Sequence, residues 1–159
     1  MPRHATIISQ SGVSAKLRAY RLARKKIVFT NGVFDILHRG HVQYLTKAKS
    51  LGDVLIVGLN TDASVRRLKG KSRPIQNQQD RAVILCSLRM VDHVILFSQD
   101  TPEKLIKKLK PDVLVKGADY KIAEIAGADF VQSYGGKVRR IRLTPGRSTT
   151  RIIKASKRK

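Results

Sequence analysis

The chain has 159 residues, of which 42% are hydrophobic, so it has the length and apolar content of one folded domain and not of a disordered tail. It carries 33 Lys and Arg residues against 11 Asp and Glu residues, and the formal net charge of +22 will attract polyanions of any kind. No apolar run approaches the ~20 residues of a membrane helix, the N-terminus lacks the apolar stretch of a signal peptide, and the single cysteine, Cys86, excludes an intrachain disulfide. We therefore expect a cytoplasmic protein.

Apolar runs that are typical of strands alternate with helical patterns along the chain. Residues 1–25 predict a basic helical N-terminal extension, and residues 26–159 predict one folded domain. Five short, largely β-branched runs predict buried strands at residues 26–31, 53–60, 92–98, 111–117 and 137–143. Helical patterns occupy residues 40–52, the first part of 61–75, 77–90, 101–110, 124–136 and 148–159. This order indicates a Rossmann-like, three-layer α/β fold around a five-stranded parallel sheet.

The loop after the first predicted strand has the composition of a phosphate site. Ligands of such folds bind at the carboxyl ends of the strands, and this loop contains two glycines and two histidines, His38 and His41. Gly32 allows the backbone to approach a ligand closely, and a helix that begins near Gly40 presents free N–H groups to an anion. Imidazole N–H groups add further donors to phosphate oxygens.

The same two histidines have two other interpretations. A zinc site requires three or four ligands, and no further His or Cys follows at a suitable spacing, so we expect no metal held by protein ligands. A pair of histidines on a surface helix is the second alternative. The position of His38 and His41 directly after a strand favours the phosphate site over both.

Two more loops carry groups that suit phosphate. Lys69, Lys71 and Arg73 flank a glycine in the middle of the chain, where a solvated basic loop is the alternative. The last predicted helix is preceded by the segment GRSTT (146–150). An ordinary N-cap needs only one hydroxyl, so three consecutive hydroxyls beside a glycine and an arginine suggest a second phosphate site. Neither a Walker A motif nor a G-x-G-x-x-G fingerprint is present.

These segments resemble a known family. GVFDILHRGHVQYL (32–45) carries the H-x-G-H signature of the cytidylyltransferase-like nucleotidyltransferases, and GRSTT resembles their C-terminal S-T-T segment. Over about residues 25–153 the chain also resembles the adenylyltransferase domains of ADP-heptose synthesis, for example in VGLNTDASVRRLKGKSRPI (57–75) and PDVLVKGADY (111–120). Val33 stands where members often have cysteine, and Ala118 where glycine is common. Both positions are expected to contribute backbone groups only.

The resemblance implies a reaction. ATP and D-glycero-β-D-manno-heptose 1-phosphate would give ADP-heptose and pyrophosphate, a step of lipopolysaccharide core biosynthesis. A sugar kinase domain often precedes this domain in the family, and with ~25 residues before the first strand we expect a stand-alone transferase here. The attacking phosphate oxygen is anionic at neutral pH, so the reaction needs no general base. Catalysis then consists of alignment and charge stabilisation.

We assign residue roles as hypotheses from this resemblance. His38, His41 and Lys71 are expected to be catalytic, the histidines at the α-phosphoryl group and Lys71 at the departing phosphates. The nucleotide-binding set is Thr30, Asn31, Gly32, Val33, Phe34, His38, His41, Lys116, Gly117, Asp119, Gly146, Arg147, Ser148, Thr149 and Thr150. The candidates for sugar-phosphate binding are Asn60, Asp62 and Arg81, with a salt bridge within its own helix as the alternative for Arg81. Asp35 is expected to cap the helix that carries the histidines, and Mg²⁺ to arrive with ATP.

Two other functions stay open at this point. The same fold could be a cytidylyltransferase that acts on glycerol-3-phosphate or another polyol phosphate, because these loops do not separate adenine from cytosine. The net charge motivates a basic nucleic-acid-binding protein, although only 5% of the residues are aromatic, few for base stacking. We therefore expect small-molecule substrates, ATP and a sugar phosphate, and neither a nucleic acid nor a membrane as partner. A homodimer or a higher oligomer is compatible with the sequence.

Overall fold

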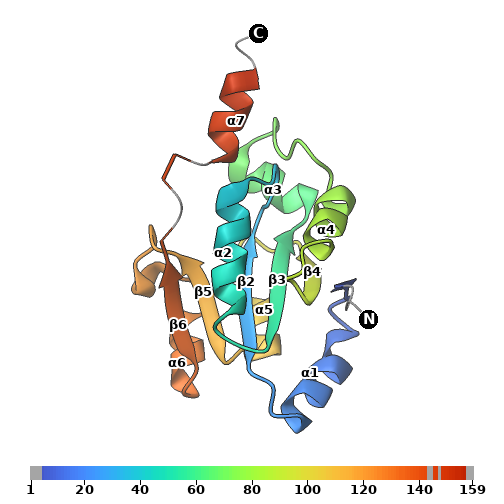
Figure 1. Cartoon of the computed structure of the whole chain (residues 1–159), viewed down its shortest axis with the longest axis vertical. Helices are drawn as coiled ribbons and strands as arrows, with labels where there is room; N and C mark the ends of the chain where they lie inside the picture. The colour runs from blue at the N-terminus through green and yellow to red at the C-terminus, as the bar shows by residue number, and fades with distance from the viewer. Residues whose placement is uncertain (1–4, 143–144, 147, 157–159) are drawn as a thin grey trace.

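The computed structural model describes residues 5–142, 145–146 and 148–156 (Figure 1). Strands and helices alternate along the chain, as the sequence predicts. The elements are β1 (Thr6–Ile7), α1 (Val13–Leu22), β2 (Ile27–Gly32), α2 (Arg39–Lys49), β3 (Val54–Asn60), α3 (Asp62–Lys69), α4 (Gln78–Cys86), β4 (His93–Phe97), α5 (Glu103–Leu109), β5 (Val113–Gly117), the 3₁₀ turn η1 (Ile122–Glu124), α6 (Ala128–Ser133), β6 (Lys137–Ile141) and α7 (Thr149–Ser156).

The strands form one parallel sheet in the order β1-β4-β3-β2-β5-β6. The sheet is parallel as predicted, but the predicted number of five strands is wrong, because the described residues form six. The additional strand, β1, has two residues and pairs with β4 at the edge of the sheet. Both of its side chains are exposed, so no buried apolar run marks it in the sequence.

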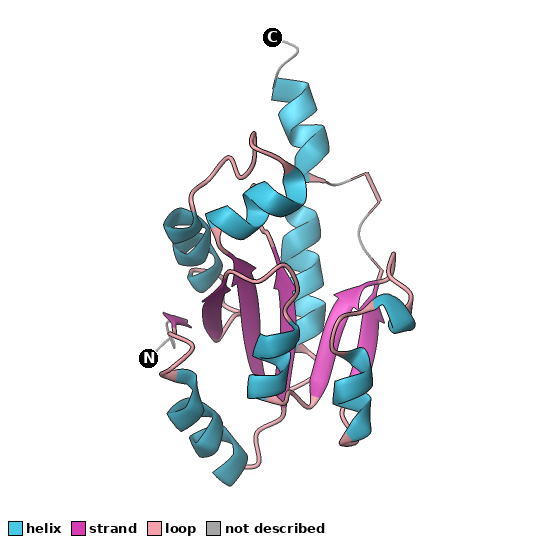
Figure 2. Ribbon diagram, turned by 180° about the vertical axis from the view of Figure 1, so that it is seen from behind, coloured by secondary structure: helices cyan, strands magenta, loops and turns pink. Residues whose placement is uncertain are grey.

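Helices cover both faces of the sheet and create two separate cores (Figure 2). One core lies between the sheet and α1, α5 and α6, and it includes Val13 and Leu17 of α1. The other core lies between the sheet and α2 and α4. Neighbouring strand residues such as Val28 and Phe29 belong to opposite cores, because successive side chains of a strand point to opposite faces. The architecture is therefore the expected three-layer α/β fold.

The segment predicted as one helix over residues 124–136 is shorter and divided. It begins as the turn η1, and α6 starts only after Gly127, whose φ of 82° lies in the left-handed region. The last helix, α7, extends beyond the carboxyl ends of the strands (Figure 1). Residues 157–159 of the predicted helix lie outside the described residues. Within the described part of the chain, every helix is too short or too polar to cross a membrane.

The order of the strands places a crevice between β2 and β5. The strands β3 and β4, which follow β2 in the chain, lie on one side of β2. The later strands β5 and β6 lie on its other side. Ligands of open α/β sheets bind at such a switch point, outside the carboxyl ends of the strands. Backbone pairing between β2 and β5 ends at Phe29 and Leu114, although each strand continues for three more residues.

Candidate active site

A cavity of about 620 Å³ opens at this switch point. Its lining joins the carboxyl ends of β2 and β5 to the beginnings of α2 and α7. The cavity brings together most of the residues that the sequence analysis assigned to substrate binding. They are Asn31, Gly32, Val33, Phe34, His38, His41, Asn60, Lys116, Gly117, Asp119, Ser148, Thr149 and Thr150. Four segments that are far apart in the sequence thus form one site.

The two histidines lie at the N-terminus of α2 with their rings stacked. The ring centroids of His38 and His41 are 3.9 Å apart, with 24° between the planes. His38 is the N-cap residue, and its Nδ1 accepts a hydrogen bond from the backbone N–H of Gly40 at 3.1 Å. An accepting Nδ1 in a neutral imidazole places the proton on Nε2. The N-terminus of α2 therefore presents an imidazole N–H, while the backbone N–H groups of Gly40 and His41 bond to His38 within the cap.

His41 is held neutral by its surroundings. Burial and, to a smaller extent, the adjacent His38 lower its pKa from 6.5 to about 4. The Nδ1 atom of His41 is buried without a hydrogen-bond partner among the described residues. The ring of Phe34 meets His41 edge-on, with centroids 5.3 Å apart. A buried, preorganised imidazole of this kind suits the stabilisation of charge that develops during a reaction.

Lys116 provides positive charge on the opposite wall. Burial lowers the pKa of Lys116, Asp119 opposes that change, and Lys69 adds to it. The Nζ atom lies 5.1 Å from the ring centroid of Tyr120, which also lines the cavity. Among the described residues no carboxylate forms an ion pair with Lys116, and such a desolvated ammonium is stabilised when an anionic ligand enters.

The start of α7 closes the site from a third side. Thr149 Oγ1 donates to the backbone oxygen of Ile36 at 3.2 Å, which ties α7 to the loop that precedes the histidines. The backbone N–H of Arg151 donates to Ser148 Oγ at 3.3 Å. Gly146 does not line the cavity, contrary to the sequence assignment. The predicted residue Arg147 lies outside the described residues.

Two more sequence assignments do not match the position of the residue. Thr30 does not line the cavity, because its side chain is fully buried beneath it. Lys71 is exposed and also lies outside the lining, whereas its neighbours Lys69 and Arg73 contribute to it. The chain turns at Gly70, where φ is 93°, and Arg73 is anchored to Asp35, so the loop presents these two cations and not Lys71.

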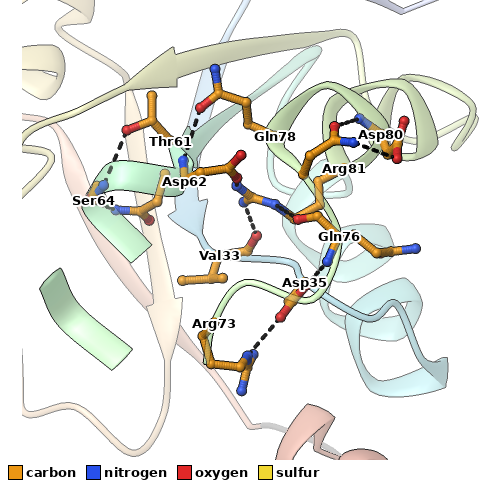
Figure 3. A network of polar contacts seen from close by, with 12 residues as sticks. Val33, Asp35, Thr61, Asp62, Ser64, Arg73, Gln76, Gln78, Asp80 and Arg81 are labelled. Atoms are coloured by element: carbon orange, nitrogen blue, oxygen red, sulfur yellow. Dashed lines mark hydrogen bonds and ion pairs between the residues drawn. The ribbon is translucent and has the colours of Figure 1, made fainter. Parts of the chain in front are cut away.

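Arg81 and Asp62, which the sequence assigned to the sugar phosphate, bind each other outside the cavity lining (Figure 3). Arg81 is 1% exposed, and its Nη2 donates to Asp62 Oδ1 at 2.7 Å. Its Nη1 donates to the Val33 carbonyl at 2.7 Å and its Nε to the Gln76 carbonyl at 3.0 Å. The ion pair joins α3 to α4, so it does not lie within one helix. Arg81 is therefore a structural centre that joins three segments around the site.

Asp35 also differs from its predicted role, since it does not cap α2. Its carboxylate accepts hydrogen bonds from Arg73 Nε at 2.7 Å and from the backbone N–H groups of Ile75 and Gln76, both at 2.9 Å (Figure 3). Burial by itself would raise the pKa of Asp35, but the hydrogen bonds from Gln76, Ile75 and Arg73 outweigh it and the pKa is lowered. Asp35 therefore holds the basic loop against the loop that contains His38.

The sequence assignment missed Tyr44 and Tyr120, which also line the cavity. Tyr44 lies three residues after His41, and residues with this spacing share one face of a helix. Tyr120 ends the segment KGADY, directly after Asp119. Across the described residues, no three His, Cys, Asp or Glu side chains come close enough to hold a metal ion.

The chain is similar to known proteins over most of its length. Residues 29–155 match the family model described as cytidylyltransferase-like. The chain is 54% identical over 149 residues to the bifunctional protein HldE of Geobacter metallireducens, covering 94% of this chain and 30% of that protein. It is 60% identical over 134 residues to the protein of the same name from Campylobacter concisus, covering 84% of this chain and 28% of the relative. The chain thus spans less than a third of these relatives.

A solved structure shares the fold. The crystal structure of the lipopolysaccharide core biosynthesis protein from Thermoplasma volcanium superimposes with a TM-score of 0.62 at 34% sequence identity. The match covers 76% of this chain and 97% of that protein.

Proposed function

Because this chain belongs to the cytidylyltransferase-like family, we propose that it transfers AMP from ATP to D-glycero-β-D-manno-heptose 1-phosphate, giving ADP-heptose and pyrophosphate. The observation that carries the proposal is the stacked pair His38 and His41 at a helix N-terminus, in one cavity with the hydroxyls of Ser148–Thr150. The choice of substrates rests on the sequence resemblance to ADP-heptose adenylyltransferase domains and on the 54–60% identity to HldE proteins. The relative from Thermoplasma volcanium, described as a lipopolysaccharide core biosynthesis protein, supports the same assignment.

The proposed reaction is an in-line displacement at the α-phosphorus of ATP. A phosphate oxygen of the sugar phosphate forms a bond to this phosphorus, and the bond to the oxygen that bridges the α- and β-phosphates breaks. Pyrophosphate leaves with the electron pair, so no proton has to be removed from the nucleophile. Protein groups therefore need to position two anions and to stabilise charge on the oxygens of the α-phosphoryl group.

The described residues supply these functions from separate walls. We assign His38 and His41 to the α-phosphoryl oxygens, because their stacked rings lie together in the cavity at the positive end of the α2 dipole. Ser148 and Thr149 are assigned to the β- and γ-phosphates, and Lys116 neutralises their charge from the opposite wall. Lys69 takes the role that was expected of Lys71, because Lys69 lines the cavity. Mg²⁺ enters with ATP as part of the substrate, in the cytoplasm where both are available.

A substrate panel tests this proposal. The purified chain is assayed for pyrophosphate release with ATP, CTP, GTP and UTP, each combined with heptose 1-phosphate, mannose 1-phosphate or glycerol 3-phosphate. We expect the highest kcat/KM for ATP with heptose 1-phosphate. A preference for CTP with glycerol 3-phosphate would instead establish the cytidylyltransferase alternative. Steeply salt-dependent RNA binding without release of pyrophosphate from any pair would support the nucleic-acid-binding alternative.

A further inference from the structure

Two buried hydroxyl groups at the floor of the cavity, those of the lining residue Tyr44 and of Thr30 below it, have no role in the mechanism above. The hydroxyls of Tyr44 and Thr30 are 2.7 Å apart, and Thr30 Oγ1 donates to the backbone oxygen of Val115 at 3.0 Å. The proton of Thr30 is therefore directed to Val115, so Tyr44 must donate to Thr30. Burial raises the pKa of Tyr44 to about 12, which keeps this hydroxyl protonated and able to donate.

This relay lies where the two central strands stop pairing. The last paired residues of β2 and β5 are Phe29 and Leu114, and Thr30 and Val115 are the next residues of each strand. One residue further on, Asn31 and Lys116 line the cavity. The Thr30 side chain thus links β2 to β5 at the floor of the crevice, directly after the last paired residues of the two strands.

Tyr44 connects α2 to the same point. The other buried side chains of α2, Leu45 and Ala48, contact the sheet through apolar surface, which has no preferred direction. A hydrogen bond from Tyr44 does have a direction, and it limits how far the helix can slide or rotate against the strands. Tyr44 lies three residues after His41, so the position of the relay also sets the position of the histidines.

We propose that the Tyr44–Thr30–Val115 relay is a positioning device that holds α2 at the depth where His38 and His41 meet the reacting phosphate. Tyr44 and Thr30 are then positioning residues and not catalytic residues. The inference rests on the proposed nucleotidyl transfer for its kinetic effect, but its structural effect on the histidines is independent of any activity.

The variants Tyr44→Phe and Thr30→Val each remove one hydroxyl and keep most of the apolar volume. For Tyr44→Phe we expect kcat to fall by about 10- to 100-fold, because a small displacement of catalytic groups has effects of this size, while KM for ATP stays within about threefold. The double variant is expected to lose no more than the stronger single variant, because both changes break the same relay.

A second measurement does not depend on turnover. We expect NMR titration of the histidine rings in Tyr44→Phe to show the pKa of His41 rising from about 4 toward 6.5, because the buried stack on His38 loosens. Tyr134→Phe is the matched control. The Tyr134 hydroxyl also donates to a backbone oxygen, that of Pro111 at 2.8 Å, and its pKa is also raised to about 12, but it lies outside the cavity lining. This control is expected to leave kcat and the His41 titration unchanged.

The outcomes separate the two proposals. If folded Tyr44→Phe retains the kcat and the His41 titration of the unmodified protein, the relay does not position the histidines. A loss confined to KM also overturns the inference, because it would mean that Tyr44 contacts substrate. If the unmodified protein releases no pyrophosphate with any substrate pair, the proposed function fails, and the His41 titration still decides whether the relay holds the histidines.

Discussion

Arg81 and Asp62 form an ion pair in which the arginine side chain is completely buried and the carboxylate is 22% exposed. The guanidinium of Arg81 also donates to the carbonyl oxygens of Val33 and Gln76. One side chain therefore holds together α3, α4, the loop that precedes the histidines and the loop that carries the basic residues. The walls of the cavity depend on a charge that lies outside the cavity lining.

Arg81→Ala should destabilise the whole fold. Removing one partner of a buried pair leaves the other groups unsatisfied, so we expect the free energy of unfolding to fall by about 3 kcal/mol. Urea denaturation measures this value. Lys107→Ala is the control, because Lys107 forms an exposed pair with Glu103 and such a pair contributes only about 0.3–0.5 kcal/mol. Equal losses in the two variants would show that Arg81 is not the structural centre described above.

His41→Ala should have the opposite profile, with a large effect on turnover and a small effect on folding. Removing one donor to a transition-state oxyanion typically lowers the rate ~10²–10³-fold. We therefore expect kcat to fall by this factor, while circular dichroism and the urea midpoint change little. Near-normal turnover of the folded variant would contradict the catalytic assignment of His41.

The stability of the protein should decrease with acid between pH 6.5 and about 4. Burial, with Lys16 adding to it, lowers the pKa of His93 from 6.5 to about 4, and His41 is lowered similarly. The unfolded chain then binds protons in this window that the folded chain does not, so the free energy of unfolding falls as the pH falls. Urea titrations across this range measure the slope.

His93→Gln is the variant for this test, because an amide can retain hydrogen bonds to Tyr20 and Thr6 without titrating. We expect a shallower dependence of stability on pH in this variant. An unchanged slope would mean that His93 does not contribute to the acid sensitivity.

Asp35→Asn should loosen the basic loop over the cavity. The amide has only one oxygen that can accept hydrogen bonds. Its NH₂ group is itself a donor and cannot bond to the donors of Arg73, Ile75 and Gln76. We expect a loss of about 2–3 kcal/mol in unfolding free energy and a raised KM for ATP. Glu103→Gln is the control, since Glu103 is 47% exposed in its pair with Lys107 and lies outside the cavity lining. A KM equal to that of the unmodified protein would show that the loop does not need this anchor.

Asp35 should cause a further loss of stability at pH values below the range in which the histidines titrate. The folded-state pKa of Asp35 is lowered below its ordinary 3.8, so its contribution to stability is present above that value and is lost as the pH falls through the folded-state pKa. Acid unfolding followed by circular dichroism should therefore be less steep in Asp35→Asn at the lowest pH values.

Lys116→Met should weaken nucleotide binding more than catalysis. Lys116 lines the cavity and its pKa is lowered by burial, so its charge is satisfied best when an anion is bound. A charged hydrogen bond contributes about 1.5–3 kcal/mol, and we expect KM for ATP to rise about 10- to 100-fold. Lys104→Met, which removes an exposed lysine outside the cavity lining, is expected to leave KM unchanged. Similar KM values in both variants would show that Lys116 does not contribute to the binding of ATP.

The sequence was sufficient for the elements that depend on local pattern. The runs that became β2, β3, β4, β5 and β6 are apolar enough to be recognised as strands, and strand–helix alternation indicates a parallel sheet. The carboxyl ends of parallel strands meet at one edge, so Asn31, Lys116 and Asn60 could be placed in one site without a structure. The strand β1 could not be found, because a pair of exposed residues has no local signal.

The tertiary structure alone decided which polar residue faces the ligand and which faces another part of the chain. Thr30 and Asn31 are neighbours, yet one is fully buried against Tyr44 and the other lines the cavity. From the sequence we expect Arg81 to bind the sugar phosphate and Asp35 to cap a helix, but their partners lie on segments 19 and about 40 positions away. Hydrophobic periodicity reports how a residue relates to its own strand or helix, whereas the partner of a buried charge is set by the packing of segments that are distant in the sequence.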